Sequence, residues 1–376
     1  MALFFLQPVA LGSWLAMIPY VQDALSLDKS TLALALLGSP AALLPVLQIA
    51  ARTMDRIGIR RMFSVVFPIQ IVAISLPFFA WNSVSLFFAL AATGAAVAFL
   101  EVGLNLYAGR YEKRTGAMIM NRSHGFWAAG LGTGSALATW LAPLDPKIIQ
   151  IGLAIASGVT GVLITKRLAH LDPVASIGKA IHRRLTEFPK ALWLIGAGMC
   201  FVTMAEGAMV DWGAVYMTER FIDNASNEPG FGAGFAVTVF ALCLAGGRFV
   251  GDALRHALGS VYLARLTIGA AIIGLSLIVV SQTPLIALTG FALIGFGVSA
   301  SYPLGVSAVA ALDDRHEASN ISLMSSIALC GFLLGPPMIG FIADKFGLPV
   351  GLATLGPGLV LSFLLAKWLG TRNGAS

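Results

Sequence analysis

Long apolar runs separated by short polar segments extend over the whole chain. Each run has about 20 residues or more, long enough for a helix rising about 1.5 Å per residue to cross a bilayer core of about 30 Å. The apolar and polar alternation that is typical of barrel strands is absent. The pattern predicts twelve membrane-spanning helices, near residues 3–25, 31–51, 62–81, 84–109, 116–142, 148–166, 191–217, 232–251, 262–281, 284–311, 318–342 and 348–368.

Composition supports this reading. The 376 residues are 57% hydrophobic and 11% charged, whereas an ordinary soluble domain has about 25% charged residues. Too few polar residues are present to cover a surface in water. We therefore expect an all-α, polytopic protein in a lipid bilayer, and we keep the first run as structure because it has no basic leader.

The basic residues predict the orientation of the chain. If the N-terminus is cytoplasmic, most Lys and Arg residues fall on the cytoplasmic side, Arg248 among them. Only Lys29, Lys147, Arg220 and Lys345 fall outside, as the positive-inside rule requires. Both termini are predicted to be cytoplasmic, in the inner membrane. This topology explains the net charge of +6, so we do not expect nucleic-acid binding.

The chain divides into two related halves. Its longest polar stretch predicts an N-terminal six-helix bundle at 1–167, a cytoplasmic linker at 168–190 and a C-terminal six-helix bundle at 191–376. At a constant offset of 201 residues, Gly94, Gly130 and Gly134 match Gly295, Gly331 and Gly335. The segment "ARTMDRIGIRRM" after the second span is echoed by "GGRFVGDALRHAL" after the eighth. Paired repeats with a central site are a transporter design.

The segment "ARTMDRIGIRRM" resembles the loop G-x-x-x-D-R-x-G-R-R/K of the major facilitator superfamily. Ala51 replaces the first glycine, and Ile59 stands at the start of the basic run. The resemblance implies the fold of that family, with two pseudo-symmetric bundles that rock against each other. It also implies a gating role for Asp55 and Arg56, which we extend to Asp252 in the echo.

A second set of polar residues lies in "FLEVGLNLYAGRYEKRTGAMIMNRSHGFW", residues 99–127. Helical rise places Glu101 and His124 at one depth, about 14–15 Å from the cytoplasmic boundary. Intramembrane charges are costly, so both should face the bundle interior or a wet cavity. We expect Glu101 to carry the coupling proton, with His124 as its partner or as a contact to the substrate. Contacts to the substrate are expected from Asn105, Asn121, Trp127 and Glu206. The alternative is a structural polar cluster that joins two helices.

Glu101, Asn105 and Asn121 are similar in arrangement to the fucose permease group, where the glutamate of helix four is associated with proton coupling and sugar recognition. That group also uses an aspartate in helix one, and this chain has none before Asp23. The resemblance implies proton symport of a sugar or a similar polar metabolite. Efflux of amphipathic compounds is the alternative within transport, although the Gly-Pro pair of such exporters is replaced by Gly134 and Ser135. A non-transporting sensor is the other alternative.

Motifs of enzymes and cofactor sites are missing from the sequence. No phosphate-binding loop, Gly-x-Ser-x-Gly or His-Glu-x-x-His occurs, and Cys200, Cys243 and Cys330 have no metal-site spacing. We expect no enzyme activity, cofactor or metal. The expected partners are a small solute, protons and lipid, with a monomer as the working form. Trp212 and Tyr216 are expected in an interfacial aromatic belt, or stacked on a sugar ring.

Overall fold

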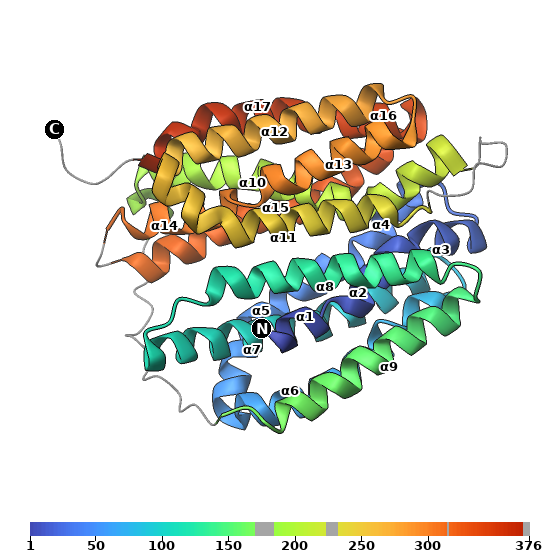
Figure 1. Ribbon diagram of the computed structural model, residues 1–376, viewed down its shortest axis with the longest axis horizontal. Helices are drawn as coiled ribbons and strands as arrows, with labels where there is room; N and C mark the ends of the chain where they lie inside the picture. Colours follow the sequence, from blue (N-terminus) through green and yellow to red (C-terminus); the bar gives the residue numbers. More distant parts are fainter. Residues whose placement is uncertain (170–183, 223–231, 314–315, 371–376) are drawn as a thin grey trace.

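The computed structural model describes residues 1–169, 184–222, 232–313 and 316–370, and every regular element in those ranges is a helix. A helix satisfies its backbone hydrogen bonds within one segment, which hydrocarbon surroundings demand. The helices form two groups that lie one above the other in Figure 1. Residues 170–183 of the predicted linker lie outside the described residues.

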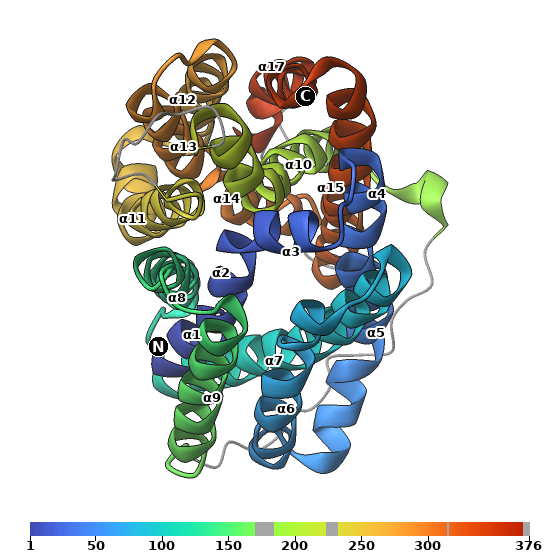
Figure 2. The same cartoon turned by 90° about the vertical axis from the view of Figure 1, so that its right-hand side faces the viewer.

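The N-terminal group precedes the linker in the chain. Its members are α1 (Ala2–Leu6), α2 (Val9–Ala16), α3 (Ile18–Ala24), α4 (Lys29–Leu36), α5 (Gly38–Ile57), α6 (Ile59–Ala73), the 3-10 helix η1 (Leu76–Phe79), α7 (Ser83–Thr115), α8 (Met120–Trp140) and α9 (Pro146–Thr165). Figure 2 shows these helices end-on, with α2 and α3 between α8 and α4.

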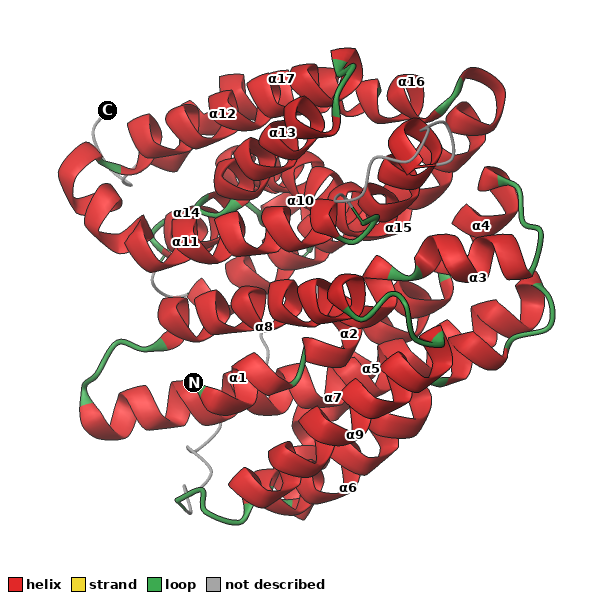
Figure 3. Ribbon diagram, turned by 45° about the vertical axis from the view of Figure 1, so that its right-hand side comes forward, coloured by secondary structure: helices red, strands yellow, loops and turns green. Residues whose placement is uncertain are grey.

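The C-terminal group follows the linker. Its members are η2 (Leu185–Glu187), α10 (Lys190–Met217), the short π-helix η3 (Thr218–Ile222), α11 (Phe235–Leu258), α12 (Ser260–Val280), α13 (Pro284–Val298), α14 (Ser301–Ala310), α15 (Glu317–Phe346), α16 (Leu348–Ala353), α17 (Leu355–Leu365) and η4 (Ala366–Gly370). Figure 3 shows the two groups as tilted helical layers, with α8 next to α11.

The predicted spans are confirmed as helices. In the described ranges, 10 helical stretches are long and apolar enough to cross a membrane, and an eleventh is the pair Ala2–Ala16 and Ile18–Ala24, bent by 45°. The fifth predicted span is α8, a helix of 21 residues that carries Asn121, Arg122 and His124 near its start. Three helices continue beyond their predicted ends: α5 reaches Ile57 and not 51, α7 reaches Thr115 and not 109, and α11 reaches Leu258 and not 251.

Four helix starts share one end of the molecule. Asp28, Asn82, Asp145 and Thr283 cap α4, α7, α9 and α13 by accepting backbone N–H groups with their side chains. Such caps satisfy donors that the first helical turn leaves free. We call the end of the molecule where α9 finishes and α10 starts the linker face. The end that carries these four caps is called the opposite face.

Two glycine turns at the linker face confirm the internal repeat. Gly58 joins α5 to α6 with φ 89°, and Gly259 joins α11 to α12 with φ 77°. Each donates its N–H to the carbonyl four residues earlier, at 2.8 and 2.9 Å. Only glycine adopts such positive φ values without steric cost. Since these glycines are also 201 residues apart, the two halves make the same turn at the same place.

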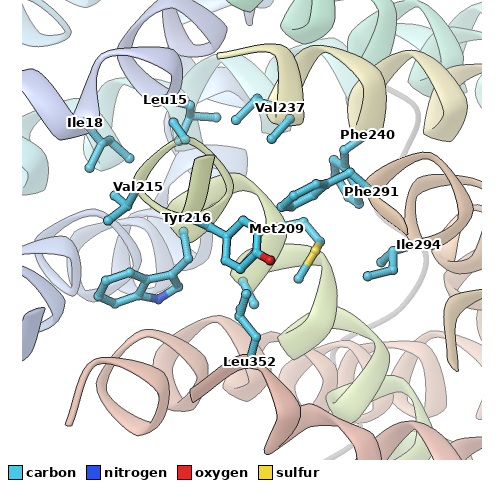
Figure 4. Packing of buried hydrophobic residues seen from close by; sticks show 14 of the residues in the cluster. Leu15, Ile18, Met209, Val215, Tyr216, Val237, Phe240, Phe291, Ile294 and Leu352 are labelled. Atoms are coloured by element: carbon cyan, nitrogen blue, oxygen red, sulfur yellow. The ribbon is translucent and has the colours of Figure 1, made fainter. Parts of the chain in front are cut away.

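The hydrophobic core is shared between the groups at one end only. Its largest cluster combines Leu15 and Ile18 with Met209, Val237 and other residues of the C-terminal group (Figure 4). This shared core occupies the half toward the opposite face. Toward the linker face, two further clusters each draw on a single group. The two groups are therefore packed together at the opposite face and have separate cores at the linker face.

The expected aromatic belt is corrected by this core. Trp212 and Tyr216 are 0% and 1% exposed, and both belong to the shared core. The Tyr216 hydroxyl lies 2.6 Å from the Ile278 carbonyl and from the Ser281 hydroxyl. Both side chains point into the protein because the shared core encloses this part of α10. The sequence alone places the two residues among the lipid headgroups.

Polar contacts also join the groups at the opposite face. Lys29 of α4 pairs with Glu219 of η3 at 3.0 Å, and the Ser30 hydroxyl lies 3.3 Å from an Asp344 carboxylate oxygen of α15. The Ser135 hydroxyl of α8 donates to the Gly234 carbonyl at 2.8 Å. These contacts close the opposite face.

Close helix packing in the N-terminal group predicts a cost for one added methyl. A Cβ on Gly134 would overlap the Val9 carbonyl oxygen of α2. Gly134→Ala should lower the melting temperature in detergent by several degrees, since overpacking costs about 1–3 kcal/mol. Gly152→Ala in α9 is the matched control, because its Cβ would meet nothing within 4 Å. Equal melting temperatures for the two variants would contradict this packing.

The ion pair at the opposite face predicts a conformational effect. Lys29→Glu sets a second carboxylate beside Glu219. A pair of this kind near the surface stabilises the closed state by about 0.2–1 kcal/mol. Its loss should therefore raise the fraction of molecules with an open opposite face a few-fold. Spin labels on the exposed residues Ala24 and Gln282 report the distance across this face. The exchange Lys29→Glu with Glu219→Lys should restore the original distances. A Lys29→Glu distance distribution like that of the parent would argue against this closure.

Candidate functional site

An ion pair lies inside the C-terminal group. Arg248 of α11 and Glu206 of α10 approach to 3.4 Å, and their side chains are 13% and 17% exposed. Helical rise places Arg248 about 15 Å before the end of α11 and Glu206 about 24 Å after the start of α10. Charges at such depth are stable when they are paired and hydrogen-bonded. The small exposed fractions show that the pair still borders an open space.

The same arginine reaches the N-terminal group. A guanidinium nitrogen of Arg248 donates to the His124 carbonyl of α8 at 3.2 Å. In return, the Asn121 side-chain amide donates to the Arg248 carbonyl at 3.0 Å. The ion pair is therefore attached to both groups, at the seam between α8 and α11.

A second carboxylate faces this pair from α7. Glu101 is partly exposed and interacts electrostatically with Arg248 and with Glu206. We call Glu101, Glu206 and Arg248 the charged cluster. It joins one residue of the N-terminal group to two of the C-terminal group.

The charged cluster lies where the shared core ends. Ala205 and Ala245 belong to the shared core, and each is within a turn of a charged residue, Glu206 and Arg248. Leu100 and Leu104, on either side of Glu101, belong to the separate core of the N-terminal group. The cluster therefore lies at the boundary between the shared core and the region toward the linker face, where each group has its own core.

A small, partly open pocket begins at Arg248 and runs toward the linker face. Its lining consists of Asn121, Gly247, Arg248, Gly251, Asp252, Arg255, Leu263, Ser299, Ala300, Pro303 and Leu304. Asn121 comes from the N-terminal group and the others from the C-terminal group. Arg248 is the member of the charged cluster that lines this pocket, so the pocket adjoins the cluster on the side of the linker face.

The other predicted site residues have varied surroundings. The His124 ring packs edge-on against Phe4, with ring centres 5.6 Å apart, while its carbonyl binds Arg248. Asn105 has a buried side-chain oxygen with no hydrogen-bond partner in the described part of the chain. The Trp127 indole donates to the Gln7 side chain at 2.7 Å. The structure thus brings Glu101 together with Glu206 and Arg248, and it turns the His124 ring toward α1.

The predicted gating residues are not equivalent in the two halves. Asp252 is exposed, lines the pocket and lies seven residues before Gly259, whereas Asp55 lies three residues before Gly58. Arg56 is exposed, and the Asp55 side chain lies outside the described residues. Their gating role stays a prediction.

Sequence reasoning missed the role of Arg248. With the eighth span ended at 251, Arg248 counted as a boundary cation, but α11 continues to Leu258 and leaves Arg248 within the helix. A useful signal was available, because Glu206 and Arg248 are opposite charges in consecutive predicted spans.

Comparison with known proteins gives the family. The model of the Major Facilitator Superfamily matches residues 1–318 and 221–375. The chain is 26% identical to an uncharacterized MFS-type transporter of Yersinia pestis, over 92% of this chain and 88% of that protein. It is 27% identical to the membrane protein MosC of Rhizobium meliloti, over 92% of this chain and 83% of MosC.

Solved structures show the same fold. A point mutant of the nucleoside transporter NupG superposes with a TM-score of 0.77 at 14% identity, covering 98% of both chains. A bacterial homologue of the human lysosomal transporter Spinster, in an inward-facing and unoccupied conformation, superposes with a TM-score of 0.67 at 14% identity, covering 98% of this chain and 95% of that one. With the family model matching nearly the whole chain, the protein belongs to the Major Facilitator Superfamily and is a multi-pass membrane transporter.

Proposed function

We propose that the protein is a proton-coupled secondary transporter that moves a small polar solute by alternating access. One observation carries the proposal: Glu206 pairs with Arg248 where the shared core ends, and the Glu101 carboxylate of the other group interacts electrostatically with both. Both groups of helices contribute to this cluster, so its charge state bears on how they approach each other. A proton is the simplest coupling ion for such a cluster.

Charge balance gives the proton its role. With both carboxylates ionised, the cluster carries one net negative charge, and a proton on Glu101 makes it neutral. Net charge is expensive in a low-dielectric site that is closed from water. A neutral cluster can therefore be enclosed during the change of access, while a charged one favours an open, wet state. Glu101 is the proton carrier in this scheme because Glu206 already has Arg248 as its counterion.

The conformation supports an assignment of sides. The shared core and the Lys29–Glu219 pair close the opposite face, and the separate cores lie toward the linker face. We assign the linker face to the cytoplasm, with both termini inside and the inner membrane as the location, because most Lys and Arg residues lie there. In this assignment the structure is inward-open, and solute enters or leaves along the pocket beside Arg248.

The solute contacts are assigned by position. Asn105 lies one turn from Glu101 on α7 and has an oxygen without a partner in the described part of the chain, and Trp127 lies one turn from His124 on α8. We assign both to the solute, together with Glu206. Asn121 is instead assigned to holding α11, since its amide binds the Arg248 carbonyl.

A second function is favoured by the same charge balance. One net negative charge can also be neutralised by a cationic solute in place of the proton, which would make the protein an antiporter for amphipathic cations. The similar structures include a nucleoside transporter and a bacterial homologue of Spinster. The direction of proton movement separates the two functions, because protons accompany a neutral solute and move against a cation. A sensor would show no saturable exchange.

Removal of the proton carrier is the first test. Glu101→Gln in liposomes that contain a pH-sensitive dye should abolish solute-dependent proton movement, while exchange of labelled solute across the membrane continues. The amide resembles the neutral carboxylic acid in shape, so the site stays intact but cannot release a proton. The assay screens sugars, sugar acids, nucleosides and cationic dyes.

Glu317→Gln is the matched control for this test, because Glu317 is exposed at the start of α15. It should leave proton movement unchanged. If Glu101→Gln also kept pH-driven uptake, Glu101 would be a structural residue and the coupling proposal would be wrong.

Loss of the arginine should be repaired by loss of its partner. Arg248→Met leaves Glu206 without a counterion, and breaking a buried pair costs about 3–5 kcal/mol. The variant should melt at a clearly lower temperature and lose transport. Adding Glu206→Gln should restore most of the stability, without restoring transport.

Arg122→Met is the control for the loss of a positive charge, since Arg122 is exposed on α8. It should melt like the parent protein. The pairing would be refuted by an Arg248→Met protein of normal stability, or by a double variant no more stable than the single one.

A further inference from the structure

A break in the tenth span lies beside the charged cluster. Ser299 and Ala300 separate α13 from α14, and both line the pocket with Arg248. The Ser301 hydroxyl is fully buried and has no hydrogen-bond partner in the part of the chain that the structure describes. Pro284–Ala310 remains one membrane span, so the interruption is a local turn within it. The turn lies beside Arg248 and leads directly to the polar side chain that follows.

Tyr302 is the first long polar side chain after the break. Its hydroxyl donates to the Ser325 hydroxyl of α15 at 2.8 Å. Both residues are partly exposed, and Tyr302 interacts electrostatically with Glu101 and Glu206. The pair keeps one unused donor, on Ser325, and free acceptor positions on both oxygens. The pair therefore has hydrogen-bonding capacity to spare within electrostatic reach of Glu101 and Glu206.

The internal repeat places this pair opposite Glu101. At the offset of 201 residues, Glu101 corresponds to Tyr302 and His124 to Ser325. Packing supports the register: Gly94 lies against the Ser39 carbonyl of α5, and its counterpart Gly295 lies against the Phe240 carbonyl of α11. The same positions therefore hold ionisable side chains in one half and uncharged hydroxyls in the other.

Charge balance limits what such a site accepts. With Glu206 paired to Arg248 and a proton on Glu101, the cluster is neutral, so an anionic solute would bring an uncompensated charge. A solute hydroxyl can accept from Ser325 and donate to Tyr302. We propose that Tyr302 and Ser325 form the C-terminal half of the solute site and bind a hydroxyl of an uncharged solute opposite Glu101. This inference rests on the proposed function and names its solute class.

Removal of the two hydroxyls tests the inference in the full-length protein. Tyr302→Phe and Ser325→Ala should each weaken binding of the preferred uncharged probe about tenfold, the worth of one lost hydrogen bond. The probes are glucose, ribose and uridine, with glucuronate and glucosamine as charged counterparts of glucose. Binding is read from the shift in melting temperature, and KM and kcat from solute exchange. KM should rise while the pH profile of uptake stays unchanged, because Glu101 is intact.

Two variants serve as controls: Tyr262→Phe, an exposed tyrosine of α12, and Ser326→Ala, the exposed neighbour of Ser325. Neither should alter binding. The inference would be overturned if Tyr302→Phe bound the probe as the parent does, if a charged counterpart were preferred, or if no uncharged probe bound.

The outcomes separate this inference from the proposed function. Binding that depends on Tyr302 without any proton movement would leave the hydroxyl pair standing and refute proton coupling. Proton movement that is lost in Glu101→Gln, with an unchanged KM in Tyr302→Phe, would do the reverse.

Discussion

The cost of a charge away from water is the constraint on which the rest of this structure depends. A chain with 11% charged residues has few ionic groups to place, and two of them pair at the seam between its two halves, with Glu101 in electrostatic reach. Arg248 and Glu206 can lie within membrane-spanning helices because each compensates the other and because the His124 carbonyl of α8 accepts a further bond from the guanidinium. In the proposed mechanism, Glu101 has no counterion of its own, so its protonation state sets the net charge.

The arrangement of the hydrophobic core gives this imbalance a mechanical consequence. One continuous core spans both groups in the half toward the opposite face, while each group has its own core toward the linker face. The charged cluster sits at the transition between these regimes. In the proposed mechanism, a change of its net charge acts on the boundary between the packed seam and the part without a shared core, where a small difference in electrostatic free energy can bias the packing of whole bundles.

The two halves share backbone features but differ in the chemistry of their side chains. The turns at Gly58 and Gly259 have the same backbone geometry, and Gly94 and Gly295 pack on equivalent helices. Glycine is retained at these places because backbone approach and positive φ tolerate nothing larger. Other positions are free of that constraint, so Glu101 in one half corresponds to Tyr302 in the other, and His124, whose ring packs on Phe4, corresponds to Ser325.

The sequence by itself predicted the membrane-spanning helices, the repeat and a small set of intramembrane polar residues that includes Glu101, because apolar length, glycine spacing and the rarity of intramembrane charge are local properties of the chain. Only the tertiary structure decided which charges meet. Arg248 looked like a boundary residue until α11 proved seven residues longer than its apolar pattern. Trp212 and Tyr216 looked like headgroup anchors until the packing of the two bundles buried them. Pairing and burial depend on how helices distant in sequence lie against each other, and no periodicity along one helix records that.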